Sequence, residues 1–128
     1  MLLHAGHDDQ VQRLMIALQP GSYVRPHRHA EQWELLALFR GVGQVLSFDN
    51  HGRIVDRIEM TTVSPVVQIP IGTWHGFLVL ELNTIIMEIK PGPYRANEFA
   101  DWAPPEGDAS VADYLRDWRS SLRTAETE

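Results

Sequence analysis

The sequence predicts one mainly β domain, an antiparallel sandwich or barrel, followed by a single helix. Short apolar runs recur at close spacing over the first 90 residues, and Gly, Pro, Asn or Asp bounds each run. Beyond residue 107 the apolar residues recur at helical intervals instead. A chain of 128 residues is long enough to bury one core, and it needs no second domain.

The strands are expected before residue 91. The first ends at Pro20-Gly21, residues 49–52 have the composition of a hairpin turn, and Pro91-Gly92-Pro93 stops the last strand. We expect these strands to form a barrel domain over residues 1–107. In chain order, the expected strands cover residues 11–19, 23–29, 35–39, 43–48, 53–60, 66–69, 75–82 and 84–90.

Residues 108–128 are expected to form an amphipathic C-terminal helix and tail, which packs on the barrel or on a partner subunit. Ser110 and Asp113 have the spacing of a capping box, with Asp in place of the usual Glu. The apolar residues that recur on one helix face are Val111, Leu115, Trp118 and Leu122.

Composition narrows the classes of partner and chemistry. The 17 acidic and 11 basic residues give a formal net charge of −6, which disfavours a nucleic-acid partner. The chain has no cysteine, so disulfides, thiolate zinc sites and a thiol nucleophile are excluded. The longest early apolar run, residues 14–18, is too short for a signal peptide or a membrane span. We therefore expect a cytoplasmic protein without a membrane partner.

The most informative group of residues is a set of candidate metal ligands. His27 and His29 are two residues apart, so in an extended strand they point to the same face. A turn over residues 30–33 would return Glu34 to that side. His75 is a fourth candidate, because it lies near the start of the strand that follows the Pro-Gly turn at residues 70–72. One His in a strand is usually a satisfied polar residue, but three with a carboxylate indicate a metal site.

Two imidazoles and a carboxylate leave coordination positions open. Such a set suits iron, manganese, nickel or cobalt, or zinc with an added ligand. We therefore expect one divalent ion, whose identity stays open among these metals. An ion with open positions can polarise a substrate carbonyl or activate a water molecule.

Further candidates lie on the strand over residues 84–90 and among the arginines. Glu88 and Lys90 share one face of that strand, and Tyr94 follows a few residues later. Glu88 and Tyr94 would act as acid/base groups if that face looks into the barrel, and the alternative is an exposed edge with an ion pair or a structural network. Arg13, Arg25 and Lys90 would hold a small anionic ligand, and ordinary solvated side chains are the alternative.

Residues 21–41 resemble the first sequence motif of the cupin family. Each fixed position of that motif is matched, by Gly21, His27, His29, Glu34 and Gly41. The core of the second cupin motif is matched by Pro70, Gly72 and His75. Ser64 and Val79 replace the Gly and Asn that begin and end that second motif.

More narrowly, the chain resembles the WbuC family of small RmlC-like cupin metalloproteins over roughly residues 4–107. The resemblance implies a jelly-roll cupin barrel in which His27, His29, Glu34 and His75 bind the metal. It also implies an association with bacterial surface-polysaccharide genes, without a settled reaction. The segments that carry the resemblance are residues 11–13, 26–29, 69–75, 88–94 and 102–104.

The function expected from these observations is that of a mononuclear metal-dependent enzyme. Its substrate would be a small anionic or sugar-derived metabolite, and its reaction an isomerisation, a lyase reaction or an oxygenation. The alternatives are a non-catalytic module that binds a carbohydrate or carboxylate, and a purely structural metal. We also expect a homodimer, because small barrels expose sheet edges and related cupins commonly form dimers.

Overall fold

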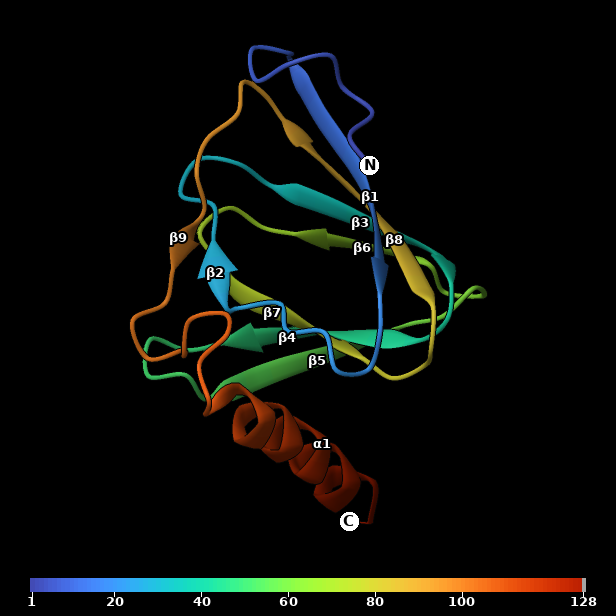
Figure 1. Cartoon of the computed structure of the whole chain (residues 1–128), viewed down its shortest axis with the longest axis vertical. Coiled ribbons are helices and arrows are strands. Elements are labelled where there is room, and N and C mark those ends of the chain that lie inside the picture. Colours follow the sequence, from blue (N-terminus) through green and yellow to red (C-terminus); the bar gives the residue numbers. More distant parts are fainter. Residues whose placement is uncertain (128) are drawn as a thin grey trace.

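The computed structural model describes residues 1–127, with side chains described for residues 1–120. Two antiparallel sheets, one of four strands and one of five, face each other, and one helix lies on the outside of the five-stranded sheet (Figure 1). The mainly β fold predicted from the sequence is therefore confirmed. The four-stranded sheet has the order β1 (Val11–Leu18), β8 (Thr84–Pro91), β3 (Glu34–Arg40) and β6 (Val66–Ile69). The five-stranded sheet has the order β5 (Ile54–Met60), β4 (Gly43–Phe48), β7 (Trp74–Val79), β2 (His27–Arg28) and β9 (Glu98–Phe99).

The main hydrophobic core lies between the two sheets. Strand β3 alternates buried and partly buried residues, so Leu36 and Leu38 point into the core, at 3% and 4% exposure. Val45 on β4 and Phe77 on β7 meet them from the five-stranded sheet. This core forms only when strands far apart in the sequence pair, since β1 pairs with β8 over the full length of both strands.

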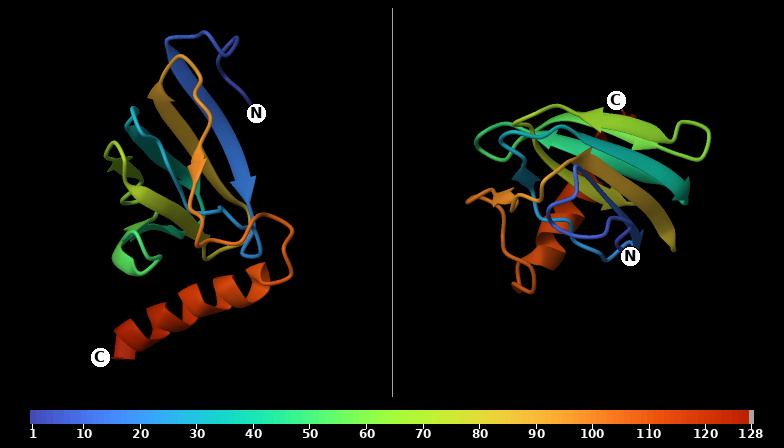
Figure 2. Two further views of the ribbon diagram at one scale, coloured as in Figure 1. Left: turned by 90° about the vertical axis from the view of Figure 1, so that its left-hand side faces the viewer. Right: turned by 90° about the horizontal axis from the view of Figure 1, so that it is seen from above.

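Strands β4 and β7 are buried on both faces, which an ordinary sandwich would not require. The reason is helix α1 (Val111–Thr127), which covers the outer face of the five-stranded sheet (Figure 2). Leu115 and Trp118 pack there against Leu46, Phe48 and Leu78. No helix among the described residues is long and apolar enough to cross a membrane.

Three details of the C-terminal segment differ from, or lie beyond, the sequence prediction. The Ser110 hydroxyl donates to Asp108 (2.7 Å), and the Arg116 guanidinium pairs with Asp113 (2.8 Å), so the predicted capping box is wrong. Asp108 is the better acceptor because it also accepts from the Ser110 backbone N–H (2.9 Å). The side chain of Leu122, and residue 128 of the predicted tail, lie outside the described residues. The division into domains at residue 107 stays a prediction.

The expected strand over residues 23–29 is shorter in the structure, and one strand was missed. Only His27 and Arg28 have ladder pairs, because Pro26 has no N–H to donate. Pro26 instead accepts from the Ala100 N–H at 3.0 Å. The missed strand is β9, two residues long, which pairs with β2 along the edge that faces away from β7.

The turn between β3 and β4 requires a glycine. Gly41 has a φ of +90°, in the left-handed region that favours glycine. A Cβ at this position would also lie 2.8 Å from the Thr84 Cα, at the start of β8. The motif glycine therefore lets the β3–β4 turn pack directly on β8, which carries two of the candidate polar residues.

Candidate metal centre

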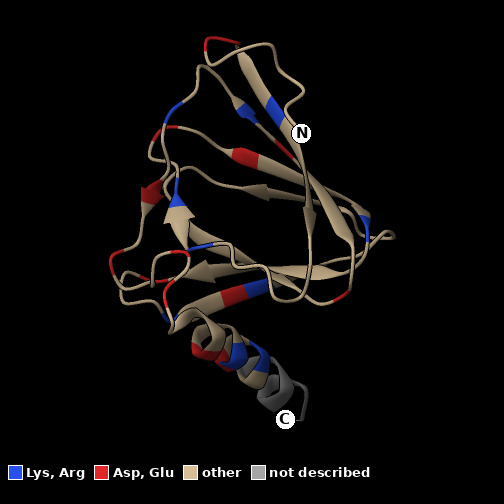
Figure 3. Ribbon diagram, viewed as in Figure 1, with Lys and Arg blue, Asp and Glu red and all other residues tan. Residues whose placement is uncertain are grey.

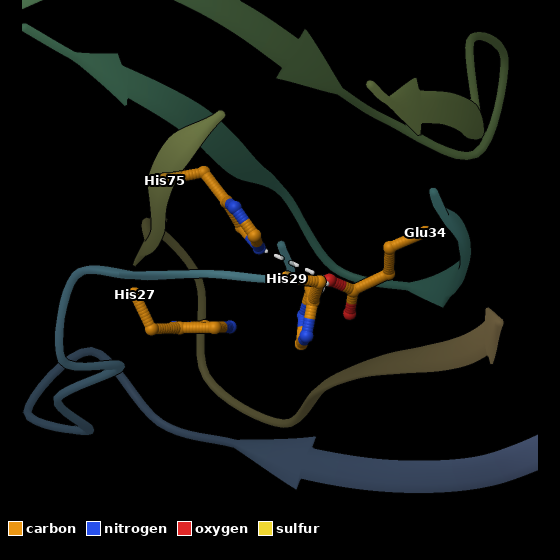
Figure 4. A group of neighbouring side chains, drawn as sticks. All are labelled: His27, His29, Glu34 and His75. Carbon is orange, nitrogen blue, oxygen red and sulfur yellow. Dashed lines mark hydrogen bonds and ion pairs between the residues drawn. The ribbon is translucent and has the colours of Figure 1, made fainter. Parts of the chain in front are cut away.

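Four buried side chains from both sheets converge inside the barrel (Figure 4). His27 on β2 lies directly opposite His75 on β7 in the antiparallel ladder. His29 follows β2, and Glu34 is the first residue of β3 in the facing sheet. Their exposures are between 2% and 7%, and one ligand atom from each lies within 4.8 Å of the others.

A single carboxylate oxygen joins the two sheets. Glu34 Oε2 lies 2.8 Å from His29 Nε2 and 3.0 Å from His75 Nε2. Burial opposes ionisation of this carboxyl group, but the contacts with His29 and His75 outweigh burial and hold the pKa of Glu34 well below its usual range. Glu34 is therefore anionic at neutral pH as long as both rings donate to it or a cation takes the place of their protons.

Proton counting shows that the group needs a cation. His75 Nδ1 lies 2.8 Å from the Thr73 carbonyl oxygen, which can only accept, so Nδ1 carries the proton of a neutral ring. The unprotonated Nε2 then faces Glu34 Oε2 at 3.0 Å, lone pair against lone pair. Either a proton between the two atoms, carried by His75 or by Glu34, or a metal ion removes this repulsion.

His27 has the arrangement of a metal-binding imidazole. Its Nδ1 donates to the Arg25 carbonyl oxygen at 2.8 Å, which leaves Nε2 free for an ion. Burial and the neighbouring His75 lower the pKa of His27 to about 4, so the ring is neutral at pH 7. A neutral imidazole is the form that binds metal ions. The donor set therefore fits one divalent ion bound through imidazole Nε2 atoms and a carboxylate.

His29 differs from the other two imidazoles because its Nδ1 is buried without a hydrogen-bond partner. Because no carbonyl oxygen accepts a hydrogen bond from Nδ1, the ring proton can sit on Nε2 and be donated to Glu34 when no ion is bound. His29 is thus the ligand whose orientation the protein restrains least, and Glu34 alone holds its ring by a hydrogen bond.

Comparisons with known proteins agree on the fold and leave the family open. Residues 1–60 match a family described as a domain of unknown function, DUF6016, which is less than half of the chain. The sequence matches no curated protein. BH2720 from Bacillus halodurans is structurally similar, with 20% identity and a TM-score of 0.61 over 70% of this chain and 68% of that one.

Two further solved structures are similar to a comparable degree. KdgF from Halomonas sp. has 16% identity and a TM-score of 0.59, over 74% of this chain and 79% of that one. A mutant of Bacillus subtilis oxalate decarboxylase has 15% identity and a TM-score of 0.60 over 71% of this chain. This chain spans 24% of the length of that decarboxylase. The chain has the cupin fold.

Within the cupin barrel, a small cavity of about 20 Å³ adjoins the ligand cluster. Apolar residues of both sheets form most of its wall, and His27, Glu34, His75 and Glu88 supply the polar part. A cavity of this size holds about one water molecule. A larger ligand would therefore approach the cluster from the rim of the barrel.

Strand β8 directs Glu88 and Lys90 into the cupin barrel, so the expectation of an exposed edge is wrong, whereas a structural role for the two side chains stays open. Strand β8 lies between β1 and β3, and Lys90 is only 7% exposed. Burial and the nearby Glu34 raise the pKa of Glu88 to about 7, while Lys90 opposes the rise. Among the described side chains, no carboxylate lies within ion-pairing distance of the Lys90 ammonium.

The side chains of Arg13, Arg25 and Tyr94 belong neither to the ligand cluster nor to the wall of the interior cavity. Arg25 is half-buried, donates to the Ala100 carbonyl oxygen (3.3 Å) and lies over the Phe99 ring at the outer side of His27. Arg13 is exposed on the outside of β1, since its neighbour Gln12 takes the inward position. Tyr94 is 49% exposed and stacks on His7 at a ring distance of 4.4 Å. The roles predicted for these residues stay predictions.

Sequence reasoning missed two groups beside the cluster. The Arg28 guanidinium forms two hydrogen bonds with the Glu98 carboxylate, at 2.7 and 2.9 Å, and stacks over Trp74. This pair fastens β9 across β2. Gln32 is 5% exposed, and its amide donates to the carbonyls of Pro91, at the end of β8, and of Pro93. The signal for the Arg28–Glu98 pair was weak, because β9 has only two residues and no apolar alternation.

The raised pKa of Glu88 predicts a specific pH dependence of stability. The folded protein holds the Glu88 proton more tightly than the unfolded chain, so the contribution of Glu88 to stability should fall as the pH rises from about 4.5 through 7. The lowered pKa of His27 acts in the opposite direction below pH 6.5, so the effect of Glu88 is read from the difference between variant and wild type. In metal-free protein, the stability of Glu88→Gln relative to the wild type should increase by on the order of 2 kcal/mol between pH 5 and pH 8, because the variant lacks this contribution. Urea unfolding at pH 5 and pH 8 measures the difference.

The matched control is Glu59→Gln, which alters an exposed carboxylate on β5. It should keep the pH dependence of the wild type. The same change in stability between pH 5 and pH 8 in Glu88→Gln and in the wild type would contradict the raised pKa of Glu88.

Proposed function

We propose that this cupin-fold protein is a mononuclear metal-dependent enzyme that acts on a small anionic or sugar-derived metabolite. The observation that carries the proposal is the shared carboxylate oxygen of Glu34, which faces two imidazole Nε2 atoms inside the barrel. His27, His29, Glu34 and His75 would hold the ion, which would be iron, manganese, nickel, cobalt or zinc. The bound ion would supply Lewis-acid polarisation of a substrate oxygen.

The residues of the chain would divide the remaining tasks. The Lys90 ammonium, which has no carboxylate partner, would hold an anionic group of the substrate at the rim. Glu88 has a pKa of about 7, so at neutral pH it can both donate and accept a proton. Arg25 would attract anions from the β2 side. Tyr94 would act only if its loop turned toward the barrel, because its ring stacks on His7.

Similarity to oxalate decarboxylase supports a small anionic ligand, because that protein is named for a reaction of a small dicarboxylate. The resemblance to the WbuC family supports a link to surface polysaccharides. A non-catalytic module that binds a carbohydrate or carboxylate is the second candidate. It is favoured by the size of the interior cavity, which leaves little room for a substrate beside Glu88.

The expected homodimer and cytoplasmic location also stay proposals. Support for the dimer comes from β5 and β6, which are both sheet edges. Val55 and Ile58 on β5 and Val66 on β6 are exposed along these edges, at 64%, 39% and 56%. Light scattering should give twice the chain mass of 14.6 kDa if the protein is a dimer. A measured mass equal to that of one chain would contradict the dimer.

Metal content is the first expected outcome. The untagged protein, purified without chelators, should contain close to one equivalent of a single divalent metal by elemental analysis. His27→Ala combined with His29→Ala should remove it, because two of the four ligands are lost. His51→Ala, in the exposed turn at residues 49–52, should retain the full content. A wild-type protein that takes up no added metal would contradict the proposal.

Binding and turnover of oxalate, used as a small anionic probe, separate the two candidate functions. Lys90→Met should weaken oxalate binding to the metal-loaded protein about tenfold, because it removes one charge-assisted contact. Its metal content should stay at the wild-type value. If the wild type converts oxalate and Glu88→Gln does not, the enzyme is supported. If the wild type binds oxalate and releases it unchanged, the binding module is supported. Equal oxalate affinity in Lys90→Met and the wild type would contradict the role of Lys90.

A further inference from the structure

A second concave site lies on the opposite side of the five-stranded sheet from the metal cluster. Helix α1 and strand β5 bound a groove of about 460 Å³. Its wall includes Arg53, Arg57, Tyr114, Asp117 and Trp118. The cluster of His27 and its neighbours faces the interior of the barrel, whereas Trp118 packs on the outer face. Figure 3 shows a blue, basic segment of β5 close to helix α1.

An irregularity in β5 builds this groove. Ser47 pairs with Asp56 and Phe48 pairs with Ile54, so the intervening Val55 has no partner in the ladder. The extra residue reverses the alternation at this point and places Ile54 on the same outer face as Arg57. Ile54 packs under α1, and Arg57 continues along the helix, opposite Leu46.

Arg57 is a fixed guanidinium without an anionic partner. Its Nη1 donates to the Gln44 side-chain oxygen and its Nη2 to the Trp118 carbonyl oxygen, both at 2.9 Å. Both acceptors are neutral. Among the described side chains no ion pair involves Arg57. Burial lowers its pKa, which reflects the cost of a charge that lacks a counter-ion.

The other polar groups of the groove are also available to a ligand. Arg53 is exposed and has no ion pair among the described side chains, and the same holds for Asp117, the one acid in the wall. Burial raises the pKa of Tyr114 to about 12, so its hydroxyl keeps its proton and can donate. Two cations and one anion give this wall a net positive charge in a chain whose formal charge is −6.

We propose that the groove between α1 and β5 binds a small organic anion through a phosphate or carboxylate group that Arg53 and Arg57 hold, with the Tyr114 hydroxyl as a further donor. Guanidinium groups match the geometry of both oxyanions. The volume is in the range of small-molecule sites. This site is separate from the metal cluster and does not depend on the function proposed for it. Because Arg57 also contacts α1, a bound anion would stabilise the packing of the helix on the sheet.

Inorganic phosphate and malonate are the probes, each titrated into the ¹⁵N-labelled full chain at constant ionic strength. We expect saturable shifts of the backbone amides of Gly52, Arg53 and Tyr114 with at least one probe. Arg53→Ala should weaken binding about tenfold, because it removes one charge-assisted contact. Arg57→Lys should weaken it similarly, since lysine keeps the charge but loses the planar geometry.

Two controls localise the effect. Arg116→Ala removes an exposed guanidinium that pairs with Asp113 on α1, outside the groove wall, and should bind like the wild type. The combined His27→Ala and His29→Ala variant should also bind normally, which separates this site from the metal cluster. Arg53 makes no side-chain contact that the fold requires, so Arg53→Ala tests the site even if Arg57→Lys fails to fold.

Preference for phosphate would identify a phosphorylated ligand, and preference for malonate a carboxylate; either outcome supports the site. Three results would overturn it. These are the absence of saturable shifts with both probes, equal affinity in Arg53→Ala and the wild type, and loss of binding in the histidine variant, which would place the anion at the metal cluster.

Discussion

The contact of one Glu34 oxygen with two imidazoles is the constraint on which the site depends. Glu34 belongs to the four-stranded sheet, whereas His27 and His75 belong to the five-stranded sheet. His29 comes directly after β2 of the five-stranded sheet. The carboxylate therefore ties the two halves of the barrel at their most polar point. Buried charges without partners are costly, so this arrangement persists only if the positive charge of protons or of a metal ion balances the carboxylate. The carbonyl acceptors at His27 and His75 favour the metal ion, because they already use the single proton of each neutral ring.

Burial of β4 and β7 on both faces explains how one sheet carries two separate polar sites. Its inner face carries the imidazoles, and its outer face carries Arg57 beneath the edge of α1. Helix α1 contributes to both sites, since it covers Leu46 on β4 and Leu78 on β7 and so buries the outer face of these two strands. The position of His75 on β7 thus depends on apolar packing on the opposite side of its strand.

Much of the fold could be predicted from local patterns, and the parts that could not are those set by distant pairing. Alternation and turn residues predicted strands close to those observed, and motif spacing predicted four candidate ligands that the structure brings together. The inward direction of Lys90 depends on β8 lying between β1 and β3, which local sequence does not specify. Strand β9 is too short to show a period, and the groove depends on the unpaired Val55. The capping prediction failed because Asp108 competes for the Ser110 hydroxyl.

The most direct test of the central claim is the position of the metal ion in a crystal, from an anomalous difference map at the absorption edge of the bound metal. The account predicts a single peak inside the barrel, about 2.0–2.3 Å from three imidazole Nε2 atoms and a Glu34 oxygen. The Nδ1 atoms of His27 and His75 should still donate to the Arg25 and Thr73 carbonyls. A peak bound through Nδ1, a peak elsewhere on the protein, or no peak between these four side chains in metal-soaked crystals would contradict the account.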